Sequence, residues 1–209
     1  MECYTSITMD RHKKRAFIFI GRSGSGKGTQ AKLLSDFLKV GSGEGSVLYI
    51  QSGYEFRNFV MGTSQTARLS KAINDEGGLQ PEFLAVYMWV NMLVESYSGR
   101  EHLIFDGTPR RPHEAGVLHS IFSFYGIEKP CVVYINVSEK WSKDHLLVRG
   151  RRDDNEKDIR SRLDWFEKEV SPTVEFYRKN EAYDFVEING EQDIKTVFKE
   201  LTEKAFKLS

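Results

Sequence analysis

One short loop sets the tightest limit on what this chain can fold into. The sequence GRSGSGKGTQ (21–30) lies between the apolar run AFIFI (16–20) and a stretch of helical spacing (27–39). Glycine at such a turn lets the backbone curl closely around an anion, at torsion angles that a Cβ would penalise. Backbone N–H groups and the positive helix end then surround a phosphate, and Lys27 adds a full charge. A plain Gly/Ser-rich turn is the alternative, but the flanking strand and helix favour a nucleotide-phosphate loop.

Strand-like runs and helical segments alternate along the rest of the chain. The runs are short and nearly continuous in apolar residues, which is typical of strands covered on both faces. This order predicts an α/β fold of the P-loop type, with a doubly wound five-stranded parallel sheet that binds ligands beyond the carboxyl ends of its strands. The predicted strands are 16–20, 47–50, 102–105, 131–135 and 183–188, and the predicted helices include 27–39, 81–96, 112–124 and 138–148.

Composition excludes several classes of protein. With 209 residues, 40% of them hydrophobic, the chain has the length of one domain with a buried core. Its 30 basic and 30 acidic residues cancel, which argues against a protein that coats nucleic acid. Cys3 and Cys131 lack the spacing of a disulfide framework or a Cys-based zinc site. We find neither a secretion signal nor a membrane span, and expect a cytoplasmic protein in which residues 1–15 form a disordered extension.

The residue after Lys27 narrows the class of phosphate loop. A standard Walker A loop has Ser or Thr there, to bind magnesium, whereas this chain has Gly28 followed by Thr29. The string GSGKGTQ resembles the nucleoside monophosphate kinases, and the adenylate kinases in particular. The resemblance extends over residues 16–206. It implies that the ATP site contains Ser23, Gly24, Ser25, Gly26, Lys27, Gly28, Thr29, His145 and Arg149.

Three further segments resemble the acceptor site of the same family. They are QSGYEFR (51–57), GGLQPEF (77–83) and FDGTPRRPHEA (105–115). In the family, the first and third carry arginines for the acceptor phosphate, and a main-chain carbonyl of the second meets the acceptor base. The resemblance implies an acceptor-binding helical excursion at 51–80. It also implies a nucleoside monophosphate site formed by Ser52, Gly53, Arg57, Gln80, Gly107, Arg110, Glu114, Arg151 and Arg162.

The segment HLLVRGRRDDNEKDIRSRL (145–163) resembles the family's lid and the helix after it. Taken alone, so charged a segment is more typical of a solvated helix face with local ion pairs. Phosphoryl transfer, however, requires converging cations, because charge spreads over the oxygens of the moving group. The lid, 149–153, is too short for a zinc knuckle, and Arg152 is an alternative to Arg151. The resemblance thus implies the catalytic residues Lys27, Arg110, Arg149, Arg151 and Arg162.

Asp106 follows a predicted buried strand and is suited to hold Mg²⁺ through water, since Mg²⁺ keeps much of its hydration shell. The alternative role for this residue is a turn or helix-cap aspartate. Mg²⁺ with ATP is the only cofactor that we expect.

Two departures from the family bear on nucleotide specificity. His145 stands where an arginine commonly packs on the adenine of ATP; it either stacks there or is a structural helix residue. Glu114 stands where adenylate kinases read the acceptor base with Gln. A carboxylate only accepts hydrogen bonds, so Glu114 favours two adjacent donors, as in guanine, and predicts a weakened AMP preference or a GMP component. The alternatives are a solvent-facing Glu114 or a one-residue shift that puts His113 in its place.

The sequence therefore predicts an ATP-dependent nucleoside monophosphate kinase, with ATP + AMP = 2 ADP as the expected reaction. The alternatives are a kinase that prefers GMP, CMP or UMP, and a nucleotide-sensing P-loop domain with little catalysis. The expected partners are ATP and a nucleoside monophosphate, with neither nucleic acid nor membrane. We expect a monomer, although apolar helix faces alone do not determine the oligomeric state.

Overall fold

The computed structural model describes residues 14–40, 43, 45–151 and 154–207. Most of the predicted extension 1–15, the alternative lid residue Arg152 and Asp153 therefore lie outside the described residues. The elements in chain order are β1 (Ala16–Ile20), α1 (Lys27–Lys39), β2 (Val47–Gln51), α2 (Ser52–Phe59), α3 (Gln65–Asp75), α4 (Glu82–Ser96), β3 (His102–Asp106), α5 (Pro112–Tyr125), β4 (Cys131–Asn136), α6 (Glu139–Arg149), α7 (Glu156–Trp165), the π-helical turn η1 (Phe166–Val170), α8 (Ser171–Arg178), β5 (Asp184–Asn189) and α9 (Ile194–Lys207).

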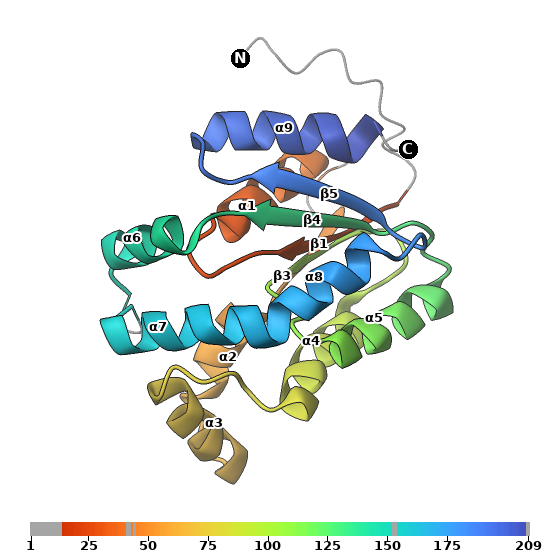
Figure 1. The fold of residues 1–209 in the computed structure, drawn as a ribbon. Coiled ribbons are helices and arrows are strands. Elements are labelled where there is room, and N and C mark those ends of the chain that lie inside the picture. Colours follow the sequence, from red (N-terminus) through yellow and green to blue (C-terminus); the bar gives the residue numbers. More distant parts are fainter. Residues whose placement is uncertain (1–13, 41–42, 44, 152–153, 208–209) are drawn as a thin grey trace.

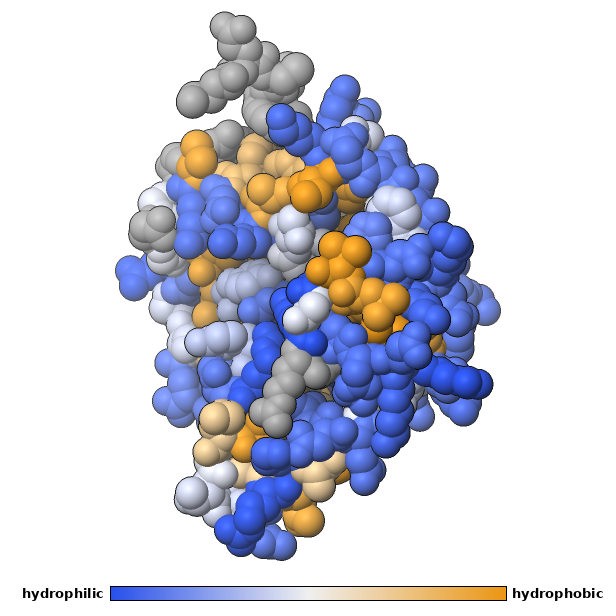
Figure 2. All heavy atoms as spheres, turned by 90° about the vertical axis from the view of Figure 1, so that its left-hand side faces the viewer, coloured by the Kyte–Doolittle hydropathy of each residue, from blue (hydrophilic) through white to orange (hydrophobic). Residues whose placement is uncertain are grey.

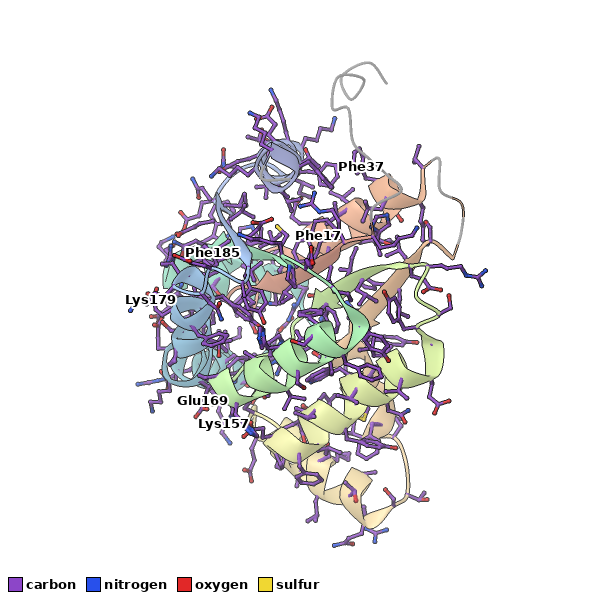
Figure 3. The ribbon with its side chains drawn as sticks, turned by 90° about the vertical axis from the view of Figure 1, so that its right-hand side faces the viewer. Phe17, Phe37, Lys157, Glu169, Lys179 and Phe185 are labelled. Carbon is purple, nitrogen blue, oxygen red and sulfur yellow. The ribbon has the colours of Figure 1, made fainter. Side chains whose placement is uncertain are left out.

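The five strands form one parallel sheet in the order β2-β3-β1-β4-β5, which confirms the predicted fold class. Helices α1 and α9 cover one face of the sheet, and α4, α5 and α8 lie on the other (Figure 1). Side chains of β1 alternate between the two layers. Phe17, labelled with Phe37 in Figure 3, points into the α1–α9 layer, where both rings approach Phe206 of α9 with centroids 5.8 and 6.0 Å away.

Four strands end one residue later than the apolar pattern predicts. Each extra residue is polar, yet it still pairs with its neighbour: Gln51 lies opposite Asp106, and Asn136 lies opposite Asn189. Ladder pairing thus continues past the last apolar side chain of each strand. The carboxyl edge of the sheet is therefore lined with polar groups, and the face of the molecule at this edge is mostly hydrophilic (Figure 2).

Local signals fix the helices that border this edge. Ser138 caps α6, its side chain accepting a hydrogen bond from the N–H of Trp141 at 3.2 Å, and Gly150 ends the helix in the left-handed region at φ 63°. Asn155 caps α7 by accepting from the N–H of Asp158 at 3.0 Å. The predicted lid, 149–153, therefore spans only the short connection between two capped helices. No described helix is long and apolar enough to cross a membrane.

Candidate active site

A cavity of about 200 Å³ lies at the carboxyl edge of the sheet, beyond β1, β2 and β3. Its walls come from five parts of the chain: the loop after β1, the start of α2, the α3–α4 connection, the loop after β3, and the α6–α7 region. They carry most of the predicted site residues. These lining residues are Ser23, Lys27, Gly28, Gly53, Arg57, Gln80, Asp106, Gly107, Arg110, Arg149, Arg151 and Arg162.

The glycine-rich loop wraps tightly against α6. Gly24 has φ +82°, and a Cβ there would lie 2.7 Å from the carbonyl oxygen of Ser142, so no other residue fits this turn. The hydroxyl of Ser142 in turn donates to the carbonyl oxygen of Ser23. Of the predicted loop residues, Ser23, Lys27 and Gly28 line the cavity. The segment 24–26 and Thr29 do not line it; Ser25 is buried, and Gly24 lies against α6.

Lys27 is the cation of this loop. Its Nζ donates to the carbonyl oxygen of Arg22 at 3.1 Å. Burial lowers the pKa of Lys27 to about 8; Asp106 opposes the shift, and nearby arginines, Arg110 foremost, add to it. Lys27 is thus only partly protonated in mildly alkaline solution, and an anion bound next to it would restore its proton.

Asp106, the last residue of β3, is held by two donors from β2. Its Oδ2 accepts from the hydroxyl of Tyr49 at 2.9 Å and from Nε2 of Gln51 at 3.1 Å. A Cβ on Gly28 would lie 3.2 Å from the same oxygen, closer than an ordinary contact. A Ser or Thr side chain after Lys27 would therefore crowd the Asp106 carboxylate, whereas Gly28 leaves room for it.

The donor set suits a magnesium ion that arrives with a nucleotide. The described residues contain no group of three or more His, Cys, Asp or Glu side chains that could enclose a metal. Asp106 instead offers one oriented carboxylate facing the cavity. Mg²⁺ usually keeps several waters and binds one or two carboxylates plus substrate phosphates, which this arrangement fits.

The acceptor-side residues are tied to one another by hydrogen bonds. The hydroxyl of Ser52 donates to the carbonyl oxygen of Gly107 at 3.0 Å, and Nε of Arg110 donates to the same oxygen at 2.9 Å. Arg110 also lies over the ring of Trp165, 5.4 Å from its centroid. Arg57 reaches the cavity from the exposed side of α2. Arg57 of α2 and Arg110 of the loop after β3 thus face the same space.

Gln80 lines the cavity, and both its side chain and its main-chain carbonyl have hydrogen-bond partners. Its side chain is buried and bonds Ser70 of α3 twice, accepting from the Ser70 hydroxyl at 2.8 Å and donating to the Ser70 carbonyl oxygen at 2.9 Å. Its own main-chain carbonyl accepts from Nη1 of Arg111 at 3.0 Å. The carbonyl that was expected to meet a base is therefore already in contact with a cation.

Asp154 holds three arginines in and around the predicted lid. Its side chain is fully buried and accepts from Nε and Nη2 of Arg149 at 2.8 and 2.6 Å, from Nη1 of Arg162 at 3.1 Å, and from the N–H of Arg151 at 3.0 Å. Hydrogen bonds from Arg149 and Arg151 lower the pKa of Asp154, against the opposing effect of burial. The bidentate pairing with Arg149 and the further hydrogen bond from Arg162 to the same carboxylate hold both guanidinium groups at the cavity wall.

Glu114, His113 and His145 have different surroundings in the structure. Glu114 is 1% exposed and lines a narrow side pocket next to the cavity, so the expectation that it might face solvent is wrong. The side chain of His113 is 80% exposed and pairs with Glu82 on the surface. His145 stacks on Trp141 within α6, with ring centroids 4.2 Å apart, and does not line the cavity.

Comparison with known proteins assigns the chain to a family. The family model described as adenylate kinase matches residues 19–182. The chain belongs to the adenylate kinase family. The adenylate kinase of Prochlorococcus marinus strain AS9601 is 29% identical over 191 residues, covering 91% of this chain and 98% of that protein. The adenylate kinase of Corynebacterium glutamicum strain R is 34% identical over 160 residues, covering 77% and 84%.

Membership of the adenylate kinase family makes the chain a nucleotide-binding nucleoside monophosphate kinase, as the resemblance implied. Sequence reasoning nonetheless missed several residues at this kinase's cavity. Phe56 and Trp165 line it, and Arg111 lies against Gln80. Trp165 follows Arg162 by three residues on one helix face, a spacing that could have identified it. Phe56 and Arg111 carry no such local signal.

Proposed function

We propose that the protein transfers the γ-phosphoryl group of ATP reversibly to AMP, giving two ADP. The observation that carries this proposal is the convergence of cations from two separate phosphate-binding loops on one cavity. Lys27 follows β1, and Arg110 follows β3, and both line the same walls. Family membership and the names of the relatives support the same reaction. A domain that only bound ATP would have no use for the second set of cations.

Each cation has a distinct place in the proposed reaction. Lys27 and the loop around it bind the phosphates of ATP. Arg57 and Arg110 bind the phosphate of AMP. Arg149 and Arg162 contact the phosphoryl group during transfer, and the carboxylate of Asp154 holds both of them. The lid residue Arg151 contacts the same group.

Electrostatic stabilisation supplies most of the catalysis in this scheme. Among the described residues that line the cavity, five arginines and one lysine face a single carboxylate, Asp106. An oxygen of the AMP phosphate attacks the γ-phosphorus of ATP, and the bond from that phosphorus to the β-phosphate oxygen breaks, so no nucleophilic side chain is needed. The loose transition state spreads charge over the oxygens of the transferred group, and preorganised guanidinium groups stabilise that charge. Mg²⁺, when bound with ATP near Asp106, would neutralise phosphate charge.

The segment 51–80 is proposed as the acceptor-binding arm and 149–153 as the lid. Residues of both line the cavity, and the two sides touch: a Cβ on Gly77 would lie 2.9 Å from Cα of Asp158 in α7. This close approach brings the end of the proposed arm against α7. It supports the proposal that the two segments together shield the transferred group from water.

The test measures ADP formation from MgATP and AMP. Arg162→Met should lower kcat at least about 100-fold, because it removes a preorganised cation from the transferred group. Arg160→Met is the matched control, since Arg160 lies two residues away on the exposed side of α7, and it should change kcat less than about twofold. Equal effects of the two variants would refute the assigned site. ATP binding without turnover of AMP, GMP, CMP or UMP would instead indicate a sensing domain.

A further inference from the structure

Helices α7 and α8 and the turn η1 between them form one continuous helical rod, from Glu156 to Arg178 (Figure 1). The N–H of Ser171 donates to the carbonyl oxygen of Phe166, five residues earlier, so the helical hydrogen bonding continues through η1. In this fully described segment, only Arg162 and Trp165 line the cavity. The residues of η1 and α8 therefore influence the site through the residues that they contact.

One face of the rod holds the ATP loop through Arg22. Glu167 accepts from Nη2 of Arg22, and the guanidinium lies over the ring of Phe166, 4.5 Å from its centroid. Nη1 of Arg22 donates to the carbonyl oxygen of Val137 at 2.8 Å. The main-chain carbonyl of Arg22 accepts from Nζ of Lys27 at 3.1 Å. The side chain of Arg22 thus anchors the residue whose carbonyl orients Lys27.

A second face of the rod holds the acceptor loop. The hydroxyl of Thr173, a fully buried residue, donates to the carbonyl oxygen of Arg110 at 2.8 Å. Nε of Arg111 donates to Glu169, which Figure 3 labels on the rod, at 2.9 Å. The guanidinium of Arg110 lies over the ring of Trp165. Trp165, Glu169 and Thr173 follow one another at intervals of four residues, which places them along one side of a helix.

The sheet joins the two loops only where they begin. Strands β1 and β3 pair as far as Phe19 and Asp106. The N–H of Gly107 then donates to the carbonyl oxygen of Phe19 at 3.4 Å, which is long for a hydrogen bond. Within the described part of the chain, no hydrogen bond joins 21–26 directly to 108–111. Beyond the sheet, the rod is therefore a shared support for both loops.

We propose that the rod sets the placement of the acceptor loop relative to the ATP loop, with Arg22 and Thr173 as positioning residues. The inference rests on the proposed function, because it takes Lys27 to bind the phosphates of ATP and Arg110 to bind the acceptor phosphate. Reacting atoms must lie about 3 to 3.5 Å apart, and a misplacement of about 1 Å can cost about 100-fold in rate. Loss of the rod contact leaves each loop able to bind its own nucleotide. The expected signature is a slower transfer step with unchanged affinities.

The experiment measures the rate of phosphoryl transfer in a single turnover, with saturating MgATP and AMP, and the Kd of each nucleotide by calorimetry. Thr173→Val should lower the transfer rate at least about tenfold and change each Kd less than about threefold. Thr173→Ser keeps the hydroxyl and should stay within about twofold of the wild-type rate. A role in packing alone predicts the reverse order, because Val keeps the volume of Thr and Ser does not.

Thr202→Val is the matched control. Thr202 is also a buried threonine, but its hydroxyl donates to the carbonyl oxygen of Phe198 within α9. Its substitution should leave the transfer rate within about twofold of wild type. A Thr173→Val enzyme with a normal transfer rate, with or without weaker AMP binding, would overturn the inference and leave the proposed function intact.

Arg22→Met cuts the other contact of the rod and should slow transfer to a similar extent. If the rod links the loops, one cut already releases it. The double variant Arg22→Met/Thr173→Val should then be no more than about threefold slower than the slower single variant. Independent local effects of two residues that do not touch would multiply instead, to a loss of about 100-fold or more. Such a multiplied loss would also overturn the inference.

If the wild-type protein phosphorylates no monophosphate, the proposed function fails, and hydrogen exchange of the nucleotide-free protein tests the rod. The N–H of Ser25 donates to the carbonyl oxygen of Arg22 at 3.1 Å and reports on the ATP loop. Thr173→Val should speed its exchange at least about threefold, because the freed rod no longer holds Arg22. An unchanged exchange rate would count against the rod. If Thr173→Val does not fold, Arg111→Met replaces it in every assay, since it cuts the acceptor end at a more exposed contact.

Discussion

The lowered pKa of Lys27 predicts that ATP binding depends on pH. With a pKa of about 8 in the empty site, Lys27 is about nine-tenths protonated at pH 7 and about one-tenth protonated at pH 9. ATP phosphates bind the charged form. The apparent Kd for MgATP should therefore rise about tenfold between pH 7 and pH 9, which corresponds to about 1.4 kcal/mol.

Calorimetry measures both the affinity for MgATP and the number of protons taken up on binding. Titration of MgATP in two buffers of different ionisation enthalpy should show uptake of nearly one proton per ATP at pH 9 and little at pH 7. Lys27→Arg is the control, because a guanidinium stays protonated between pH 7 and pH 9. The ionisation of ATP itself is the same in both titrations. A Kd that does not change between pH 7 and pH 9, or a wild-type profile equal to that of Lys27→Arg, would refute the reasoning.

Two further variants test the contacts around the cavity. Gly77→Ala, whose Cβ would meet Asp158 at 2.9 Å, should raise the KM for AMP about tenfold with little change for ATP. Steady-state kinetics measure the KM for AMP. Gly99→Ala is the control, since Gly99 also has positive φ but a Cβ there would have no neighbour within 4 Å. Equal KM values in both variants would contradict the proposed contact. Asp154→Asn should lower kcat about tenfold or more and the free energy of unfolding by about 2 kcal/mol, because it weakens the charged hydrogen bonds from Arg149. Steady-state kinetics measure kcat, and urea unfolding measures the free energy of unfolding. An unchanged kcat would show that Asp154 does not position the lid.

Local patterns predicted most of the fold. The apolar strands and the glycine-rich loop carry their signal within a few neighbouring residues, so their positions followed from hydrophobicity and turn chemistry. The polar strand ends could not be predicted in this way, because Gln51 and Asp106 extend the sheet only by pairing with each other across strands. The π-helical turn η1 was also missed.

The candidate site shows the same division. The motifs identified the segments that form the cavity, but not every residue that lines it: Phe56 lies inside the motif 51–57 and lines the cavity, although the resemblance gave it no role. Near Pro112, the sequence left the helix register uncertain by one residue. Adjacent helix residues point about 100° apart, so this uncertainty left open whether Glu114 or His113 faces the interior. Only the three-dimensional packing of α5 shows which of the two is buried.

The rod α7–η1–α8 also bears on which length changes this chain can tolerate. Glu167 of η1 pairs with Arg22 in the ATP loop, Glu169 holds Arg111, and Thr173 of α8 donates to the carbonyl oxygen of Arg110 at 2.8 Å. Loss of one residue within η1 would turn everything after it by about 100° about the helix axis. Both loops at the cavity would then lose their partners on this rod together. A deletion in this helical turn is therefore expected to disturb two walls of the cavity at once.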